Sequence, residues 1–292
     1  MSYAPLYLYA IPCGWRSGNF GDMFGPEIVR HITGRTVTLV DWTVTDESCR
    51  AELVTVGSYA QNLPRDFKGW VWGTGLMFEH AEVQCAKAPV RALRGKLTAA
   101  RWPGRPDVPL GDPGLLVPFV RGPIVSKKRY AVGIVPHYVD CDDPMLCEFL
   151  KRNLDTAVAI DPCSRRMPEA MAECEVILSS SLHGLVTADA LGIPNAWIVL
   201  SDKVQGGSFK FRDYVSAFGV TDRLVYRLYP GSSIQDIQMY ALESWTWGGK
   251  VKDVATELAA SFPPIDNADD IAEADAESAE ADTDAPASSE TA

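Results

Sequence analysis

One stretch constrains the fold of this chain more than any other, the segment from Val176 to Pro194, which reads VILSSSLHGLVTADALGIP. Its first three residues are apolar and predict a short buried strand, and three serines follow them. The apolar periodic run that comes next is closed by Gly192 and Pro194, which predicts a helix with a Gly/Pro stop. A serine-rich turn at a helix start offers hydroxyl groups and free backbone N–H groups, so the segment predicts an anion-binding site.

A histidine falls in the first turn of this predicted helix. His183 follows Ser180 and Ser181, and imidazole titrates near neutral pH, so it is a proton-transfer group beside the predicted anion site. A second histidine, His137, follows the apolar run of residues 130–135 and is expected at the same edge of the sheet. A lone histidine is more often structural, but two histidines at one sheet edge favour a reactive site.

Short apolar runs separated by small-residue turns predict an α/β fold with one open sheet in each half of the chain. In the first half we expect a helix over 26–32 and strands over 7–11, 36–40, 53–56, 69–72 and 89–93. In the second half we expect helices over 145–152, 167–174 and 182–191, alternating with strands over 130–135, 156–160, 176–179 and 195–199. This alternation predicts parallel sheets covered by helices on both faces.

A segment with Pro118, Gly122 and the basic run Lys127–Arg129 predicts a linker between the halves. We therefore expect Rossmann-like domains over 1–118 and 119–262, the second ending in a helix over 254–262, and a tail over 263–292. The tail holds ten of the 38 acidic residues and no basic residue. It has almost no large apolar groups and cannot offset the entropy of ordering, so we expect it to be disordered.

Without this acidic tail the chain is nearly neutral, although the whole sequence carries a net charge of −11. A nearly neutral folded part disfavours nucleic acid as a partner. The seven cysteines are scattered and form no CxxC pair, and the four histidines show no HxxxH spacing. This distribution predicts reduced, mostly buried thiols in a cytoplasmic protein and disfavours a zinc site, so we expect no metal.

Polar side chains also follow other predicted strands. Asn19 and Asp22, in a glycine-rich loop after the first strand, favour a polar ligand, although both residue types are common in turns and helix caps. Arg94 follows the fifth strand, and a guanidinium group matches the geometry of carboxylate and phosphate groups. Lys210 and Arg212 open a helix running to residue 218, where acidic residues are more usual, so they either contact an anion or form an interdomain salt bridge.

Together these pieces resemble the polysaccharide pyruvyl transferase family, over about residues 7–219. The resemblance is most specific in the segment SSSLHGLVTADALGIP. Within the family, the chain is similar to the bacterial exopolysaccharide branch, of the succinoglycan ketolase type. The other matching pieces are NFGD at 19–22, GTG at 73–75, RGKLT at 94–98, GDP at 111–113, VPH at 135–137 and KFRDY at 210–214. The resemblance implies a GT-B-like pair of Rossmann-like domains, with the acceptor on the N-terminal side and phosphoenolpyruvate on the C-terminal side.

The resemblance also implies a reaction. Pyruvate is transferred from phosphoenolpyruvate onto two hydroxyl groups of a sugar in an exopolysaccharide repeat unit, which forms a cyclic ketal and releases phosphate. Phosphoenolpyruvate is the donor substrate, and no cofactor is expected. A lipid-linked oligosaccharide is the expected acceptor, which is compatible with a cytoplasmic protein at the inner face of the membrane that makes peripheral contacts with membrane-bound polysaccharide assembly enzymes.

For this reaction we predict His183 as the general acid that protonates the methylene carbon, alone or also as the base for the sugar hydroxyl. Asp22 or His137 is expected as the second proton acceptor. Many family members carry an arginine two positions before the histidine, where this chain has Ser181, so a cation from another segment is expected to replace it. The residues expected to bind substrate are Asn19, Gly21, Thr74, Arg94, Ser180, Ser181, Leu182, Gly184, Lys210 and Arg212; the candidates for the missing cation are Arg94, Lys210 and Arg212.

Two other functions are compatible with the sequence. A nucleotide-sugar glycosyltransferase or epimerase on the same frame also binds phosphate at a helix start, and UDP-sugars rather than phosphoenolpyruvate would stabilise it. A non-catalytic binding protein would use the acidic tail to recruit basic partners. Both explain less well why the polar turns fall at strand ends.

Overall fold

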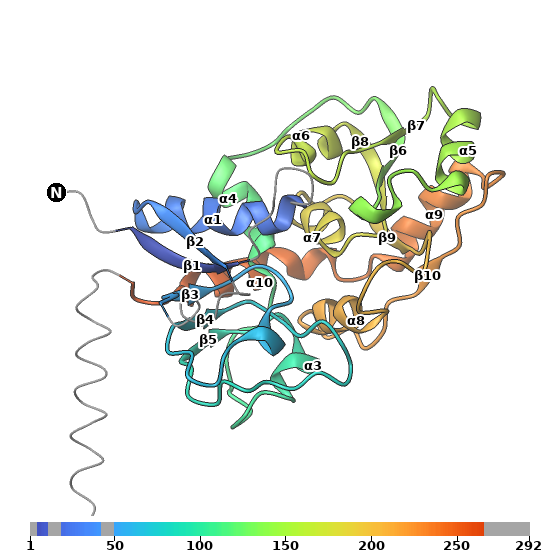
Figure 1. Cartoon of the computed structure of the whole chain (residues 1–292). Helices are drawn as coiled ribbons and strands as arrows, with labels where there is room; N and C mark the ends of the chain where they lie inside the picture. The colour runs from blue at the N-terminus through green and yellow to red at the C-terminus, as the bar shows by residue number, and fades with distance from the viewer. Residues whose placement is uncertain (1–4, 11–18, 42–49, 266–292) are drawn as a thin grey trace, which may run out of the picture.

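The computed structural model of the chain describes residues 5–10, 19–41 and 50–265 (Figure 1). Within these residues the strands form two five-stranded sheets, ordered β2-β1-β3-β4-β5 and β10-β9-β8-β6-β7. Every pairing within both sheets is parallel. The predicted fold class, α/β with two Rossmann-like sheets, is therefore confirmed.

The first sheet is built from the first half of the chain. Its strands are β1 (Leu6–Ala10), β2 (Val37–Asp41), β3 (Leu53–Val54), β4 (Trp70–Trp72) and β5 (Val90–Ala92). The helical segments of this half are α1 (Phe20–Thr33), η1 (Ala60–Asn62), α3 (Lys96–Ala99), η2 (Pro113–Leu116) and α4 (Val117–Arg121). All five strands lie where the sequence predicts them, and their ends differ from the predicted ends by no more than two residues.

The second sheet follows from residue 130. Its strands are β6 (Tyr130–Val135), β7 (Ala157–Ala159), β8 (Cys174–Ser179), β9 (Asn195–Ile198) and β10 (Val225–Tyr226). The helical segments are η3 (Tyr138–Asp140), α5 (Pro144–Arg152), α6 (Met167–Ala172), α7 (Leu182–Ala190), α8 (Phe209–Ser216), α9 (Ile234–Ser244), η4 (Gly248–Lys250) and α10 (Val251–Ala260). The predicted alternation is confirmed, and β10 and α9 are additions to it.

Strand β8 occupies the centre of the second sheet, between β6 and β9. Ile177 and Leu178 are fully buried there, as expected for a strand with both neighbours present and helices on its faces. Ser179 is the last residue of the strand and pairs with Val135 and Trp197. The serine turn and helix α7 therefore leave the carboxyl edge at the middle of the sheet, where parallel α/β proteins bind ligands.

The two sheets share one buried apolar core. Helices α1, α4, α7 and α10 lie between them (Figure 1), and the core includes Leu6 and Phe24 from the first half and Ile177 from the second. Helix α10 follows the second sheet but packs on the first, where the Trp72 indole N–H donates to the carbonyl of Leu258 (3.1 Å). This core contains residues from both sides of the predicted domain boundary between residues 118 and 119. The boundary itself stays a prediction.

The predicted tail is described only at its start. Ile265 is 4% exposed and packs in the core, so this residue of the predicted tail belongs to the folded part of the chain. The predicted disorder of 266–292 lies outside the described residues. None of the helices in the described part of the chain combines the length and hydropathy needed to cross a bilayer.

The expectation of mostly buried cysteines is wrong for the five that the structure describes. All five are free; Cys85 and Cys174 are buried, Cys141 is exposed, and Cys147 and Cys163 are half-buried. Cys141 and Cys163 lie in turns that follow the carboxyl ends of β6 and β7. Cys13 and Cys49 fall outside the described residues.

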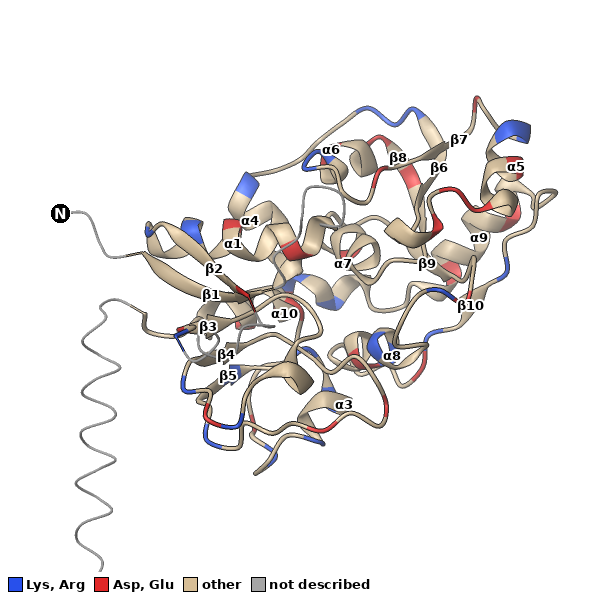
Figure 2. Ribbon diagram, in the orientation of Figure 1, with Lys and Arg blue, Asp and Glu red and all other residues tan. Residues whose placement is uncertain are grey.

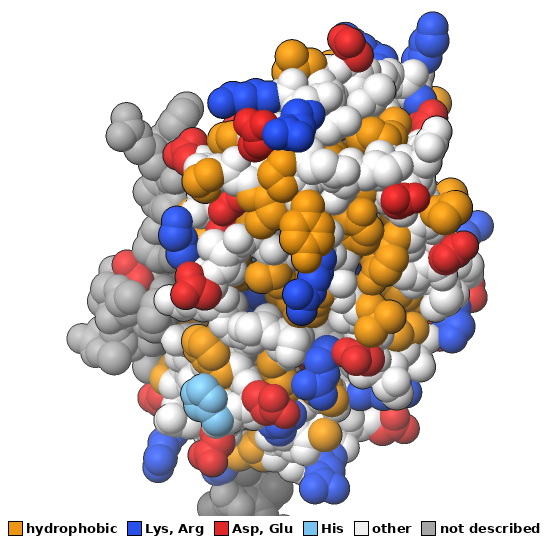
Figure 3. Space-filling view, turned by 90° about the vertical axis from the view of Figure 1, so that its right-hand side faces the viewer, with side chains coloured by type: hydrophobic (Ala, Val, Ile, Leu, Met, Phe, Trp, Pro, Cys, Tyr) orange, Lys and Arg blue, Asp and Glu red, His pale blue; other side chains and the backbone are white. Residues whose placement is uncertain are grey.

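Charged residues of both signs are interspersed over the two halves (Figure 2). This distribution agrees with the nearly neutral composition of the chain before its tail. On the face that carries α5, α9 and β10, hydrophobic side chains lie among charged ones (Figure 3). Exposed hydrophobic residues on and around α9 and β10 include Leu224, Tyr229, Met239 and Leu242.

Candidate functional site

A cavity of about 510 Å³ lies between the two halves of the molecule. Its residues follow β1, β3 and β4 of the first sheet and β6, β8 and β9 of the second, so both sheets present their carboxyl edges to it. The first half contributes Asn19, Asp22, Gly57, Ser58, Tyr59, Gln61, Asn62, Met77 and Phe78, and the second contributes His137, Tyr138, Val139, Ser181, Leu182, His183, Lys203, Gln205 and Lys210.

The serine turn holds the second wall of the cavity in place. The Ser179 hydroxyl lies 2.7 Å from the carbonyl of Val135 and accepts the Ser181 N–H (3.0 Å), which ties the turn to β6. The Ser180 hydroxyl accepts the His137 N–H (2.8 Å) and donates to Asp140 (3.0 Å). Two of the three serines are thus committed to the turn, and Ser181 is the one that lines the cavity.

A chain of hydrogen bonds crosses the cavity floor between α1 and α7. Asn19 caps α1, and its Nδ2 donates to Asp22 (2.5 Å) while its Oδ1 lies 2.6 Å from His183 Nδ1. The Tyr59 hydroxyl donates to the other oxygen of Asp22 (2.8 Å). Because the Asn19 oxygen faces the ring, His183 donates from Nδ1, and the neutral ring keeps its lone pair on Nε2.

The His183 ring requires a glycine on the opposite helix. A Cβ atom at Gly21 would lie 2.1 Å from His183 Cγ, so any other residue there would displace the ring. Gly184 has a similar constraint, since its Cβ would lie 2.3 Å from Ser179 Oγ. Neither glycine lines the cavity, and both let α7 pack closely.

Burial keeps both cavity histidines neutral at pH 7. It lowers the pKa of His183 to about 4, with Asp112 opposing the shift and the Lys210 and Arg94 charges adding to it. Burial and the charges of Lys210 and His183 likewise lower the pKa of His137 to about 4. His183 Nε2 is buried and has no hydrogen-bond partner among the described residues. His183 is therefore a proton acceptor in the ligand-free protein rather than a donor.

The carboxyl group of Asp22 titrates near neutrality. Burial raises its pKa to about 6, against the opposing effect of the hydrogen bonds from Tyr59 and Asn19 and of the Lys210 charge. Asp22 is mostly ionised at pH 7 and takes up a proton just below it. A half-buried carboxyl group and a neutral imidazole linked through one amide form a pair that can exchange protons with a ligand.

Lys210 is the cation of the cavity. Its side chain is 6% exposed, and its ammonium group has no ion pair or hydrogen bond with any described residue, only a 5.5 Å approach to the Phe211 ring. Burial and the Arg94 charge lower the pKa of Lys210 to about 8, with Asp22 opposing. Lys203 is a second cation at the cavity, but its side chain is exposed.

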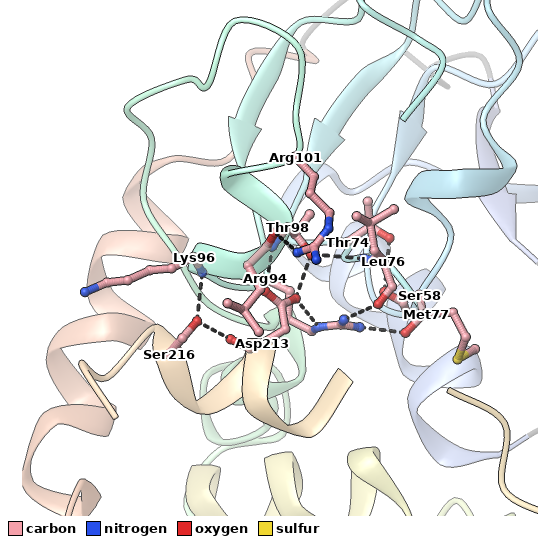
Figure 4. Close-up of polar contacts among 12 residues, drawn as sticks. Ser58, Thr74, Leu76, Met77, Arg94, Lys96, Thr98, Arg101, Asp213 and Ser216 are labelled. Carbon is pink, nitrogen blue, oxygen red and sulfur yellow. Dashed lines mark hydrogen bonds and ion pairs between the residues drawn. The ribbon is translucent and has the colours of Figure 1, made fainter. Parts of the chain in front are cut away.

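The other two cations predicted for the site lie elsewhere. Arg94 is fully buried, and its guanidinium group donates to Asp213 (2.9 Å), to the Ser58 hydroxyl (2.6 Å) and to the carbonyl of Leu76 (2.5 Å) (Figure 4). Arg212 is half-buried on α8, and it too is not part of the cavity wall. Thr74 lies beneath the wall, where its hydroxyl accepts the Tyr59 N–H (3.1 Å) and positions that tyrosine.

The structure therefore brings together Asn19, Asp22, His137, Ser181, Leu182, His183 and Lys210 of the predicted site. The cavity residues that sequence reasoning missed are Gly57, Ser58, Tyr59, Gln61, Asn62, Met77, Phe78, Tyr138, Val139, Lys203 and Gln205. The Gly57-Ser58 turn could have pointed to Tyr59, because it follows β3 and so marks another strand end at the same edge of the sheet. Over the described residues, no group of three or more His, Cys, Asp or Glu side chains is placed to hold a metal ion.

No family model matches the chain. Among solved structures, it is similar to the glycosyltransferase SnogD from Streptomyces nogalater (13% identity, 95% of this chain and 100% of that one, TM-score 0.45). It is also similar to the wall teichoic acid polymerase TagF (9% identity, 94% of this chain and 90% of that one, TM-score 0.45).

Two relatives are similar in sequence. Succinoglycan biosynthesis protein ExoV of Rhizobium meliloti (strain 1021) is 30% identical over 142 residues, which cover 46% of this chain and 42% of ExoV. Uncharacterized protein L143 of Acanthamoeba polyphaga mimivirus is 32% identical over 220 residues, which cover 72% of this chain and 74% of that protein. The chain belongs to the same protein family as L143.

Proposed function

We propose that this protein is a transferase of polysaccharide biosynthesis that moves pyruvate from phosphoenolpyruvate onto a saccharide as a cyclic ketal and releases phosphate. The role in polysaccharide biosynthesis is supported by the similarity to the succinoglycan biosynthesis protein ExoV. The pyruvyl transfer is supported by the SSSLHG segment and the cavity that it lines. The observation that carries the proposal is Lys210, which is 6% exposed and whose ammonium group forms no ion pair or hydrogen bond with any described residue, in the same cavity as His183.

A dianionic or trianionic donor suits this cavity. Burying an ammonium group without a paired counter-charge is unfavourable, and the Asp22 charge offsets this only in part. A bound carboxylate or phosphate group supplies a direct partner. The Ser181 hydroxyl and the N–H groups at the start of α7 lie on the same wall and add hydrogen-bond donors. Phosphoenolpyruvate carries both kinds of anionic group, and Lys210 takes the place of the cation that Ser181 does not provide.

The proposed reaction transfers two protons, from the two sugar hydroxyl groups to the methylene carbon and to the leaving phosphate. The methylene carbon of phosphoenolpyruvate takes up one proton, and the two sugar hydroxyl groups each lose one as they bond to the central carbon. The bond from this carbon to the phosphate oxygen breaks, and the remaining proton leaves on hydrogen phosphate. The site must therefore give a proton to carbon and accept protons from the hydroxyl groups.

His183 can take both roles in turn. In the free protein its pKa of about 4 leaves it neutral. A bound anion beside the ring favours the charged imidazolium and raises this pKa, so donor binding loads His183 with the proton that it gives to the methylene carbon. Asn19 fixes the ring and its tautomer through the 2.6 Å contact with Nδ1. The neutral ring that remains then accepts a hydroxyl proton.

Asp22 is the better second acceptor. At pH 7 its carboxyl group is mostly ionised, because its pKa is about 6. The alternative acceptor, His137, receives the Val139 N–H at Nδ1 (3.4 Å), so its neutral ring carries the proton on Nε2 and donates there. We therefore assign His137 to donor binding and Asp22 to proton acceptance.

The saccharide is assigned to the first-half wall. Asn62 presents an amide group and Phe78 an aromatic ring there, which are the groups that bind sugar hydroxyls and sugar faces. Gln61 holds this wall together, since its amide contacts Ser58, Asn62 and Met77. We propose a lipid-linked oligosaccharide as the acceptor, reached from the cytoplasm at the inner face of the membrane.

Incubation with phosphoenolpyruvate and candidate lipid-linked saccharides tests the proposal, with phosphate release and the mass of the saccharide as the two readouts. We expect phosphate release that depends on the acceptor, together with a pyruvyl mass gain. Thermal stabilisation by UDP-sugars, with no stabilisation by phosphoenolpyruvate and no phosphate release, would contradict it.

A further inference from the structure

Helix α8 carries two buried charges one turn apart that face different surroundings. Lys210 reaches the cavity, and Asp213 docks against α3 of the first half (Figure 4). One Asp213 oxygen accepts from Arg94 Nε (2.9 Å) and the Thr98 hydroxyl (2.7 Å), and the other accepts the Thr98 N–H (2.8 Å). Asp213, Arg94 and Thr98 are all fully buried, so this contact excludes water.

The contact between α8 and α3 is close. A Cβ atom at Gly95 would lie 1.8 Å from the Asp213 carbonyl oxygen, so only glycine permits this approach. Gly95 is also the N-cap of α3 and has no side chain to satisfy the first N–H groups of that helix. The Ser216 hydroxyl accepts the Lys96 N–H (2.8 Å) and Asp213 accepts that of Thr98, so α8 caps α3 from the other half of the molecule.

Arg94 extends this contact to the opposite wall of the cavity. Its two terminal nitrogens donate to the Ser58 hydroxyl and to the carbonyl of Leu76. Ser58 and Met77, the residue after Leu76, both line the cavity. A continuous set of buried polar contacts therefore joins the helix that carries Lys210 to the wall that faces it.

We propose that Asp213 is a positioning residue: through Arg94 and Thr98 it holds α8 so that the Lys210 side chain stays in the wall of the cavity. Asp213 does not line the cavity. The identity of the anion that Lys210 receives rests on the proposed function, whereas the positioning of Lys210 does not.

The ionisation of Lys210 reports its position. Its pKa of about 8 results first from burial and then from the Arg94 charge. The other titratable groups around it are Asp22 on α1, His137 after β6, His183 on α7 and Lys203 at the cavity edge. If α8 moves off α3, Lys210 gains water, and its pKa rises toward the ordinary value of 10.5.

The experiment follows the Cε resonance of Lys210 against pH in full-length, ligand-free protein labelled with 13C-lysine, assigned by its loss in Lys210→Arg. We expect a midpoint near 8 in the wild type and an increase of about one pH unit or more in Asp213→Asn. Thr98→Val, which removes one bond to Asp213 and leaves the ion pair, is expected to shift the midpoint in the same direction by less. Thr98→Val carries the test if Asp213→Asn does not fold.

The matched control is Glu27→Gln, which removes an ion pair of the first half away from the cavity lining, that of Glu27 with Arg121 (2.7 Å). It is expected to leave the Lys210 midpoint where it is in the wild type. An unchanged or lower midpoint in both Asp213→Asn and Thr98→Val, with only folding stability reduced, would overturn the proposal.

The affinity for phosphoenolpyruvate distinguishes a failure of this proposal from a failure of the proposed function. In Asp213→Asn we expect its dissociation constant to rise about tenfold or more, with no change in Glu27→Gln. A wild-type protein that binds no phosphoenolpyruvate would contradict the proposed function and leave the midpoint test intact.

Discussion

Lys210 on α8 and Arg94, which contacts α8, are both buried basic residues, but only the charge of Arg94 is paired within the described part of the protein. Arg94 has a carboxylate, a hydroxyl and a carbonyl oxygen as partners, is fully buried and does not line the cavity. Lys210 has no such partner among the described residues and borders a cavity of about 510 Å³. A buried charge whose hydrogen-bonding capacity is filled holds the fold together, whereas one left open is suited to an external anion.

This contrast separates two roles that the sequence had placed together. Arg94, Lys210 and Arg212 were equal candidates for the cation that replaces the family arginine at Ser181. The structure leaves Lys210 as the candidate that lines the cavity and places Arg94 in the contact between the halves. The ligand side and the structural side of the comparison should therefore respond differently to substitution.

The largest effect is expected on the ligand side. His183→Ala should reduce phosphate release on the order of 10²–10⁴-fold, the range of a lost general acid or base. The fold should stay intact, because His183 borders the cavity and has one polar partner, Asn19. Steady-state assays with phosphoenolpyruvate measure the rate, and His31→Ala, at an exposed histidine of α1, is the control. Full activity of His183→Ala would remove His183 from the mechanism.

The structural side should respond to Asp213→Asn with a loss of stability. Removing one partner of a fully buried ion pair leaves the Arg94 charge uncompensated, which costs about 3–5 kcal/mol. Urea unfolding measures this change, with Glu27→Gln, at a half-buried pair, expected to cost less. A loss under about 1 kcal/mol would mean that the Arg94 contact does not hold the halves together.

Acidification should reduce the stability of the fold through the neutral His183. Because the pKa of His183 is lowered from 6.5 to about 4, the unfolded chain binds more protons between these values, so stability falls as pH falls through this window. At pH 4.5 the loss relative to pH 7 is about 2–3 kcal/mol for this one group. Asp22 acts with the opposite sign, since its pKa is raised from 3.8 to about 6.

His183→Gln should therefore lose less stability than the wild type when urea unfolding at pH 4.5 is compared with that at pH 7. The same comparison for His31→Gln should match the wild type. Equal pH dependence in wild type and His183→Gln would show that His183 is not held neutral.

The smallest effect distinguishes the two cations directly. Lys210→Met replaces an unpaired buried ammonium by an apolar side chain of similar length, so we expect the free energy of unfolding to increase by about 1 kcal/mol. This is the reverse of the change expected for Asp213→Asn. A destabilisation of Lys210→Met similar to that of Asp213→Asn would mean that the Lys210 charge also has a structural partner.

The parts of the fold with local signals could be predicted from sequence. The strand and helix around the serine turn are marked by Val176–Leu178 and Gly192, and the structure places β8 and α7 there. Strand β10 could not be predicted, because it is a two-residue strand at the edge of the sheet. Helix α9 exposes Met239 and Leu242 as well as burying Ile237 and Ala241, which blurs its apolar periodicity.

The candidate site divides in the same way. Asn19, Asp22, His137 and His183 come together because parallel strands direct their carboxyl ends to one edge, a rule that the sequence pattern carries. The role of Arg94 could not be predicted, because its partner Asp213 is 119 residues away and no local pattern links them. Tyr59, Gln61 and Asn62 lie in and before a 3-10 turn, whose position over the cavity depends on how the two halves meet.

The most direct test of the central claim is calorimetric titration of phosphoenolpyruvate into the wild type, Lys210→Met and Lys203→Met. If the unpaired buried ammonium receives the anion, Lys210→Met should weaken binding about tenfold or more, and Lys203→Met, which removes an exposed charge, should weaken it less. Equal affinity in wild type and Lys210→Met, or a larger loss in Lys203→Met, would contradict the assignment of Lys210 as the anion-binding cation.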